Sequence, residues 1–428
     1  MRASAGGYYA NLMSMYKHLG IPLHPVRFLF VFAKAAMGAS REPMLKRRVE
    51  SETGTYFIHA SNLHQTPPPW PGNRGVLAHL AEIVYLILCH FWFSVACFIV
   101  QPRTESTTES SCEGGESLAE YLQRIWLPRR FASQYLLPLM SSVSTCSHDE
   151  MLAFPASDVV SYKKLSHGRQ HYVVCGGVEQ VQSRLADGID DVRVRSRVLE
   201  IVPQKDATQR AMVRWQTYGT DGSSHVSEEA FDRVVLAVSP DVAGRIYRPL
   251  ATMMTKMPTI RVESSVLAPT KPYKAEAQTF SVVKDHDPSS TRCMHHSGDV
   301  ATAQIITLKT RFSQDSPRTE ALHTMPSGVA VQTCPLNDVD PKSALQTAAF
   351  TRTLRTTESR ALVHRIMGRS NKAQEEKKID IKHDGWTNGQ DNVWLTGAWC
   401  WDGMVLLEGC VVSAMRVADD FGVNVPWA

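Results

Sequence analysis

Strict alternation of apolar and polar residues marks two segments in the middle of the chain. They are residues 192–202 (VRVRSRVLEIV) and 211–218 (AMVRWQTY). A period of two predicts strands with one buried face. Residues 231–238 (FDRVVLAV) and 392–399 (NVWLTGAW) are instead nearly continuous apolar runs. Such runs are typical of strands buried on both faces, so we expect these two to share one sheet.

Apolar residues spaced three or four apart predict helices at both ends of the chain, over residues 8–19 (YYANLMSMYKHL) and 406–421 (LLEGCVVSAMRVADDF). Residues 178–185 form a shorter amphipathic helix between two expected strands, and residues 344–367 are also expected to be helical. Helices interspersed with strands indicate an α/β protein.

The most unusual pattern is an apolar run over residues 83–100 (IVYLILCHFWFSVACFIV), interrupted only by His90 and Ser94. As a helix it would be roughly 27 Å long, close to the thickness of a bilayer core. His79 and Glu82 limit its extension toward the N-terminus. The run therefore has two interpretations, a helix buried beside an apolar substrate cavity or a membrane-associated helix. The polar residues 101–117 that follow are expected to form a mobile loop.

Composition narrows the function classes. The chain has 428 residues, 43% of them hydrophobic, which favours two domains over one. Lys and Arg number 46 against 42 Asp and Glu, a net charge of +4 with no basic stripe, so nucleic acid is not expected as a partner. Nine cysteines without a CxxC pair suit a reducing, intracellular compartment. Cys293, His295 and His296 lack a second ligand pair, so no metal site is predicted.

Three segments together form a pattern. They are Gly176-Gly177 with its following helix and strand, the strand that ends in Ala-Val-Ser-Pro at Pro240, and residues 393–409 with the helix after them. In order and separation they resemble the later part of amine-oxidase-like flavoproteins, in particular a subgroup of NAD/FAD-binding oxidoreductases. The resemblance extends to YYANLMSMYKHLGIP near the start and YLLPLMSSVSTCSHDEMLAFPA in the middle.

The resemblance implies FAD as the cofactor and assigns roles to individual positions. Val198 matches the strand position whose backbone faces the adenine, and Ala237 and Val238 match the contact along the adenosine side. Gly397 matches the position beside the ribityl and pyrophosphate groups, where an acidic residue usually follows and this chain has Ala398.

Glu408 and Gly409 match the start of a helix that points toward the flavin pyrimidine ring. Electrostatics supports this last role, because the partial positive charge of a helix N-terminus would stabilise a reduced, anionic flavin. No catalytic acid or base can be named from residue spacing. Trp399 and Trp401 are candidates for an aromatic wall of the site, or simply for packing at a strand end.

The sequence contains no GxGxxG motif, which normally holds the pyrophosphate at a helix N-terminus. The expected fold is therefore a two-domain FAD-binding α/β flavoprotein with an incomplete N-terminal Rossmann βαβ unit, and weak FAD binding is expected unless further sequence precedes Met1. We expect a cofactor domain from residues 166–260 and 386–428, and a substrate domain from residues 1–165 and 261–385.

The expected function is FAD-dependent oxidation or desaturation of a hydrophobic, lipid- or polyketide-like small molecule. The alternative is a truncated or cofactor-free relative that acts as a membrane-associated binding protein. Residues 83–100 are the segment through which either protein could associate with a membrane.

Overall fold

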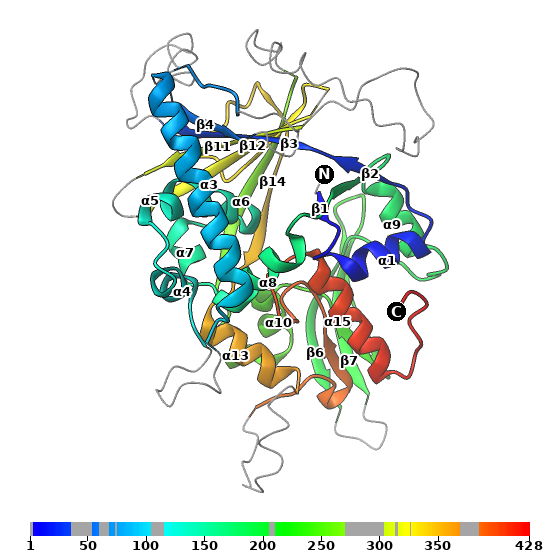
Figure 1. The fold of residues 1–428 in the computed structure, drawn as a ribbon. Coiled ribbons are helices and arrows are strands. Elements are labelled where there is room, and N and C mark those ends of the chain that lie inside the picture. The colour runs from blue at the N-terminus through cyan, green and yellow to red at the C-terminus, as the bar shows by residue number, and fades with distance from the viewer. Residues whose placement is uncertain are drawn as a thin grey trace, which may run out of the picture.

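A seven-stranded mixed sheet forms one half of the molecule (Figure 1). The computed structural model describes residues 3–35, 54–59, 68–72, 75–103, 115–204, 210–269, 304–312, 316–325, 327–368 and 385–428. The order of the strands across the sheet is β14 (Ala344–Thr353), β10 (Thr259–Leu267), β13 (Ala330–Thr333), β12 (Arg318–Thr324), β11 (Gln304–Arg311), β3 (Phe28–Lys34) and β4 (Thr55–His59). Strands β11 and β3 run parallel and the other neighbours antiparallel, so segments far apart in sequence are joined in one sheet.

The prediction of a helix over residues 344–367 is wrong in its first half. Ala344–Thr353 forms the edge strand β14, which pairs with β10 along its whole length, and only Thr357–Ile366 is helical (α13). Most side chains of β14 are exposed, so its apolar residues show no buried face that the sequence could reveal. Pairing with β10 therefore outweighs the local preference of an alanine-containing segment.

Helices from the first 166 residues share a hydrophobic core with strands of this sheet. They are α1 (Ala10–His18), α3 (Val76–Ile99), α4 (Leu118–Arg124), α5 (Arg129–Phe131), the π-helical turn η3 (Ala132–Leu136), α6 (Leu137–Ser144), α7 (His148–Leu152) and α8 (Ala156–Ser166). Capping boxes at Ser117 and Ser147 fix the starts of α4 and α7, because each serine hydroxyl accepts a backbone N–H that would otherwise have no partner.

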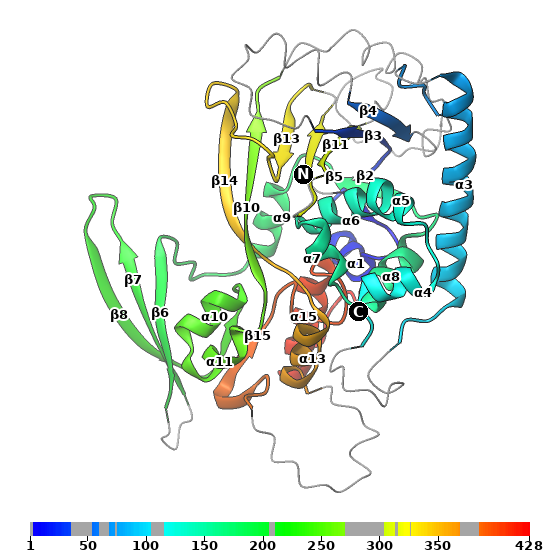
Figure 2. The same cartoon turned by 90° about the vertical axis from the view of Figure 1, so that its left-hand side faces the viewer.

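The other half contains smaller sheets. A meander of β6 (Ser196–Pro203), β7 (Ala211–Tyr218) and β8 (Ser224–Phe231) extends away from the rest of the molecule (Figure 2). Strands β1 (Ser4–Ala5), β5 (His171–Val174) and β2 (Leu23–Val26) form an antiparallel sheet, and β9 (Val234–Leu236) pairs in parallel with β15 (Val393–Leu395). The remaining helices are α9 (Glu179–Ala186), α10 (Pro240–Ile246), η4 (Arg248–Leu250), α11 (Ala251–Met254), η5 (Gln390–Asn392) and α15 (Leu407–Asp420).

Two hydrophobic cores meet at the C-terminal segment. One core gathers α1, α3, α4 and α6–α8, and it includes Met404 and Val411 from the end of the chain. The other surrounds β9 and β15, and it includes Leu395 and Trp399. Residues 393–411 thus belong to both cores, so packing from two sides fixes the position of this segment.

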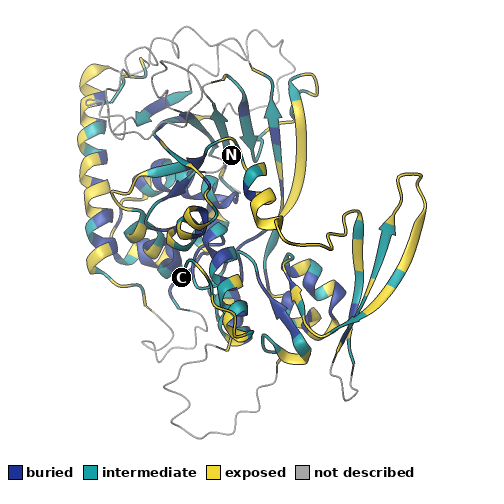
Figure 3. Cartoon of the chain, turned by 90° about the vertical axis from the view of Figure 1, so that its right-hand side faces the viewer, coloured by how far each residue is buried: buried dark blue, intermediate teal, exposed yellow. Residues whose placement is uncertain are grey.

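Helix α3 is longer than the sequence predicted, and most of its polar residues lie on the face that contacts the protein. It begins at Val76 because His79 and Glu82, which we expected to limit the helix, lie on its buried face. Its outer face is largely exposed and apolar (Figure 3), so it does not line a buried cavity among the described residues. By length and composition alone it could cross a membrane.

The loop that we expected to be mobile over residues 101–117 and the Cys293, His295 and His296 cluster lie wholly or largely outside the described residues. Six of the described cysteines are free thiols, whereas Cys175 is disulfide-bonded. The cysteines are therefore not all reduced. This differs from the expectation that we drew from their spacing.

The buried side chain of His148 makes the stability of the protein depend on pH, which allows its packing to be tested. Its ring is 2% exposed, its Nε2 lies 2.9 Å from the Thr319 hydroxyl, and burial lowers the pKa of His148 to about 4. An unfolded histidine titrates near 6.5, so the unfolded chain binds the extra proton first and stability falls as the pH drops from about 6.5 to 4. We expect His148→Gln to remove about 2 kcal/mol of the stability lost between pH 7 and 5, measured by urea unfolding. The exposed His225→Gln is the control, and an unchanged pH dependence in His148→Gln would contradict the assignment.

Candidate functional site

The carboxyl ends of β9 and β15 meet at one point. Val393, Trp394 and Leu395 pair in parallel with Val234, Val235 and Leu236, although some 160 residues separate the strands. The prediction that these two apolar runs share a sheet is confirmed, and they form a two-stranded sheet among the described residues. Because the strands are parallel, the residues that follow them lie at the same edge, which is where α/β proteins bind ligands.

Hydrogen bonds fix the loop that follows β15. The Trp399 indole donates to the Val238 carbonyl (3.0 Å), which ties this loop to the end of β9. Gly397 has φ +138°, a conformation that only glycine adopts readily. The Ser413 hydroxyl accepts the Gly397 N–H (2.9 Å) and donates to the Gly409 carbonyl (2.7 Å), so helix α15 holds the loop from the other side.

Most of the residues that the resemblance selected thus come together. Val238, Gly397 and Gly409 are connected through Trp399 and Ser413, Ala237 is exposed at the end of β9, and Ala398 is half-buried beside Gly397. Ser413 was missed, although a serine four residues after a glycine at a helix start can bond back to the i−4 carbonyl.

Val198 is the exception. It lies on β6, in the three-stranded meander, next to a bulge in its pairing with β7, and its side chain is 36% exposed. Ile201 of the same strand shares a core with Leu236 and Leu395. The structure therefore places Val198 on a neighbouring sheet rather than in the loop cluster.

Helix α15 begins at Leu407, as the sequence predicted to within a residue, but the Glu408 side chain has an unforeseen partner. Its carboxylate accepts hydrogen bonds from the Asn11 backbone N–H (2.9 Å), the Asn11 side-chain amide (2.8 Å) and the Leu12 backbone N–H (3.0 Å). These donors lie in the first turn of α1, where an anion is favoured by unpaired N–H groups and by the helix dipole. Glu408 therefore caps α1 from the other end of the chain.

Trp401 packs directly on the start of α15. A Cβ added to Gly409 would lie 2.4 Å from the Trp401 ring and 2.6 Å from the Ala398 carbonyl oxygen, so no other residue fits at this position. The indole donates to the Met404 carbonyl (3.0 Å) and its ring contacts Tyr8 edge-on. In this structure the close approach that Gly409 permits is made by Trp401.

Arg355 lies beneath the same loop and was not foreseen, because nothing in its sequence context distinguishes it. Its side chain is completely buried, and Nη2 donates to the carbonyls of Trp399 (2.9 Å) and Trp401 (3.0 Å). Burial lowers the pKa of Arg355 from its usual value, while the nearby Asp158 carboxylate raises it. The Nε and Nη1 atoms have no hydrogen-bond partner among the described residues, so two buried donors are available to an acceptor.

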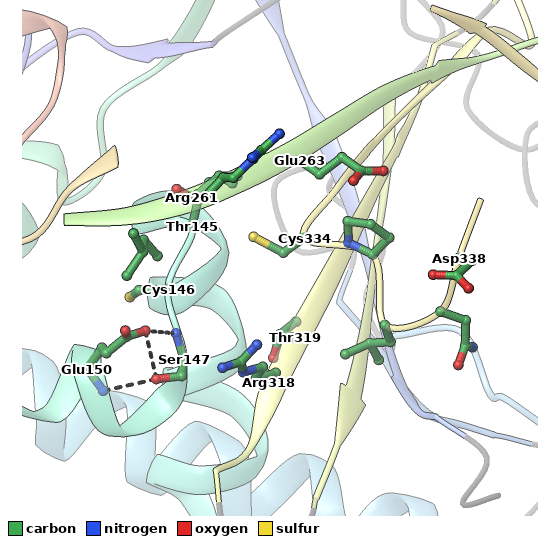
Figure 4. A pocket seen from close by; sticks show the side chains of 15 residues that line it. Thr145, Cys146, Ser147, Glu150, Arg261, Glu263, Arg318, Thr319, Cys334 and Asp338 are labelled. Atoms are coloured by element: carbon green, nitrogen blue, oxygen red, sulfur yellow. Dashed lines mark hydrogen bonds between the residues drawn. The ribbon is translucent and has the colours of Figure 1, made fainter. Parts of the chain in front are cut away.

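A cavity of about 370 Å³ lies between the helices and the large sheet (Figure 4). Its walls come from the end of α6, from α7, from β10 and β12, and from the segment after β13. The lining includes Thr145, Cys146, Ser147, Glu150, Ile260, Arg261, Val262, Glu263, Arg318, Thr319, Cys334, Pro335, Leu336, Asn337 and Asp338. No spacing in the sequence relates these residues, which is why sequence reasoning missed the cavity.

The cavity is lined by polar and apolar groups in about equal measure, and its thiols are not activated. Burial raises the pKa of Cys334 to about 11 and that of Cys146 further still, so both thiols are protonated at neutral pH. Glu150 is occupied by the backbone N–H and hydroxyl of Ser147, at 2.7 and 2.8 Å. Arg352, which influences both cysteines, donates to the Val405 carbonyl (2.7 Å) and so connects this region to the segment before α15.

Comparison with known proteins places this geometry in context. A family model described as flavin containing amine oxidoreductase matches residues 8–263. Among solved structures, cyclohexylamine oxidase from Brevibacterium oxydans IH-35A is similar over 98% of this chain and 87% of its own, with a TM-score of 0.53 and 11% identity. Wild-type putrescine oxidase bound to putrescine matches over 97% and 86%, with a TM-score of 0.46 and 12% identity. No curated protein matches the chain in sequence.

Removing the Glu408 carboxylate should separate the two ends of the chain. We expect Glu408→Ala to lower the free energy of unfolding by about 2–4 kcal/mol, because a buried cluster of donors loses its charged acceptor. Glu408→Gln keeps an acceptor oxygen and should lose less. The exposed capping residue Glu120→Ala is the matched control, with a loss of about 1 kcal/mol or less. Equal losses in Glu408→Ala and Glu120→Ala, measured by urea unfolding, would show that the cap does not matter.

Proposed function

Because this chain belongs to the family of flavin-containing amine oxidoreductases, whose model matches more than half of it, we propose that this FAD-dependent oxidoreductase oxidises or desaturates a hydrophobic, lipid- or polyketide-like substrate. The observation that carries the proposal is a contact between the cavity wall and the segment that leads into α15. Arg352 pairs in register with Ile260, one of the residues that line the cavity of Figure 4, and donates to the Val405 carbonyl. We place the substrate in the cavity and the cofactor at the β9–β15 edge.

The residues at that edge fit FAD in their donor chemistry. FAD supplies the redox step when bound, accepting a hydride equivalent from the substrate. The buried Nε and Nη1 of Arg355 are donors that suit the carbonyl and phosphate oxygens of such a group. We assign the ribityl and pyrophosphate contacts to the backbone of Gly397 and Ala398, and the contact with the pyrimidine ring to the helix start at Glu408 and Gly409. Because Trp401 packs on Gly409 in this structure, its ring would have to turn aside for that last contact.

We assign the adenosine half of the cofactor to the other strands. Ala237 and Val238 follow β9, where the exposed backbone of Ala237 is accessible to a ligand. Val198 would contribute its backbone from β6. Because Val198 lies on a neighbouring sheet, a dinucleotide that contacted it would have to extend beyond the flavin end of the site.

The cavity and helix α3 are evidence for two different features of the proposed substrate. Arg261, Arg318 and Glu263 give the cavity charged walls, which suits a polar end on the substrate. The outer face of α3 is apolar, which suits a hydrophobic body that reaches the protein from a non-aqueous phase. The amine chemistry of the family makes a C–N bond the first candidate. Its oxidation to an imine would give a hydride to FAD and release one proton.

A homologous series of substrates tests this proposal. We expect anaerobic flavin bleaching by primary alkylamines to become more efficient with chain length, by about fourfold in kcat/KM per methylene while the cavity accommodates the chain, because each buried methylene contributes about 0.8 kcal/mol. Putrescine is the short, doubly charged control and should react poorly. Alcohols and alkenes of equal length test the requirement for nitrogen. Preference for putrescine, or a rate independent of chain length, would contradict a hydrophobic substrate.

A further inference from the structure

Helix α3 has its polarity inverted relative to a helix that faces water. Its polar residues His79, Glu82 and Ser94 all lie on the buried face. Its exposed side chains are apolar apart from His90, and they include Leu77 (83% exposed) and Phe91 (66%). An amphipathic helix in water turns charged residues outward, so an apolar, uncharged outer face running the length of α3 indicates a non-aqueous environment.

The inner face of α3 is fixed to the protein. Glu82 forms an ion pair with Arg130 and accepts a hydrogen bond from the Tyr135 hydroxyl. At the other end, the Tyr121 hydroxyl donates to the carbonyls of Ala96 (3.1 Å) and Val100 (3.0 Å). A helix crossing a bilayer would have to break these contacts and carry Glu82 into hydrocarbon, which costs several kcal/mol. The helix therefore stays on the body and presents one face.

Aromatic and basic side chains border that face. Trp126 is 88% exposed, and the hydrogen bond from the Trp92 indole to the Ile125 carbonyl (2.8 Å) places it beside α3. Arg129 is exposed next to Arg130, the partner of Glu82. Lys163 lies 3.4 Å from His90 in the middle of the helix, and Lys164 contacts Gln101 just past its end. Burial, together with Lys163, lowers the pKa of His90 to about 4, so the ring is neutral near pH 7.

We propose that the outer face of α3, with Trp126, docks on the surface of an anionic lipid membrane, with the helix lying in the plane of the interface. Apolar side chains would enter the acyl boundary, tryptophan would sit at the headgroup level, and the basic border would meet anionic headgroups. A second copy of the chain fits less well, because a symmetric dimer through this face would bring the same basic residues toward one another. This inference rests on α3 and its border, and it does not depend on the proposed substrate.

Flotation with preformed vesicles tests the docking. The full-length protein is mixed with phosphatidylcholine vesicles or with vesicles containing about one-third phosphatidylserine. We expect it to float with the anionic vesicles, and at least tenfold less with the neutral ones or in high salt. The double substitution Ile87→Glu and Phe91→Glu should reduce the bound fraction at least tenfold. Lys163→Gln with Lys164→Gln should reduce binding to anionic vesicles only.

The matched control is Val226→Glu with Val423→Glu, at two exposed apolar positions far from α3 in sequence, which should bind vesicles like the wild type. Circular dichroism and thermal unfolding check that each variant is folded. Light scattering without lipid tests the alternative, in which a second copy of the chain covers this face. A dimer that Ile87→Glu and Phe91→Glu converts to monomer, with no vesicle binding, would overturn the proposal in favour of self-association. A monomer that binds neither kind of vesicle would overturn it outright. Flavin content and amine oxidation are not part of the readout, so failure here leaves the proposed function standing.

Discussion

The contact between the Glu408 carboxylate and the first turn of α1 is the constraint on which the candidate site depends. Three donors from Asn11 and Leu12 converge on one buried carboxylate at 2.8–3.0 Å. The contact joins helices that are nearly four hundred residues apart, and so connects the two ends of the chain at a single charged group. It also fixes the start of α15, from which Ser413 positions the backbone of Gly397. Loss of this one group would leave the start of α15 held by core packing and by the contact between Tyr8 and Trp401.

Local pattern was sufficient to predict the elements with strong periodicity. The parallel pair of β9 and β15 followed from two continuous apolar runs, and α15 followed from its helical spacing. Strand β14 was beyond this reasoning because its partner β10 lies some eighty residues earlier and its own side chains are mostly exposed. The start of α3 was misjudged because Glu82 was assumed to need water, whereas Arg130 and Tyr135 satisfy it inside the protein.

In the candidate site, too, some residues could be predicted from the sequence and others depend on the tertiary fold. Positions carried by a contiguous motif, such as Gly397 and Gly409, could be selected from the sequence because close backbone approach requires glycine. The partner of Glu408, the buried Arg355 and the cavity could not be selected. Each depends on segments that only the tertiary fold brings together, and their residues belong to types that are common at ordinary positions.

A continuous series of contacts runs from helix α3 to the cavity. Glu82 of α3 binds Tyr135, which lies in the π-helical turn η3, and η3 continues without a break into α6. Helix α6 ends at Thr145 in a left-handed conformation, where Thr145 and Cys146 enter the cavity wall. From Ala132 to Ser144 this helical path is roughly 20 Å long, at 1.5 Å per residue. The contacts of Glu82 with Arg130 and Tyr135 therefore relate the position of α3 to the start of the helical segment that ends at the cavity wall.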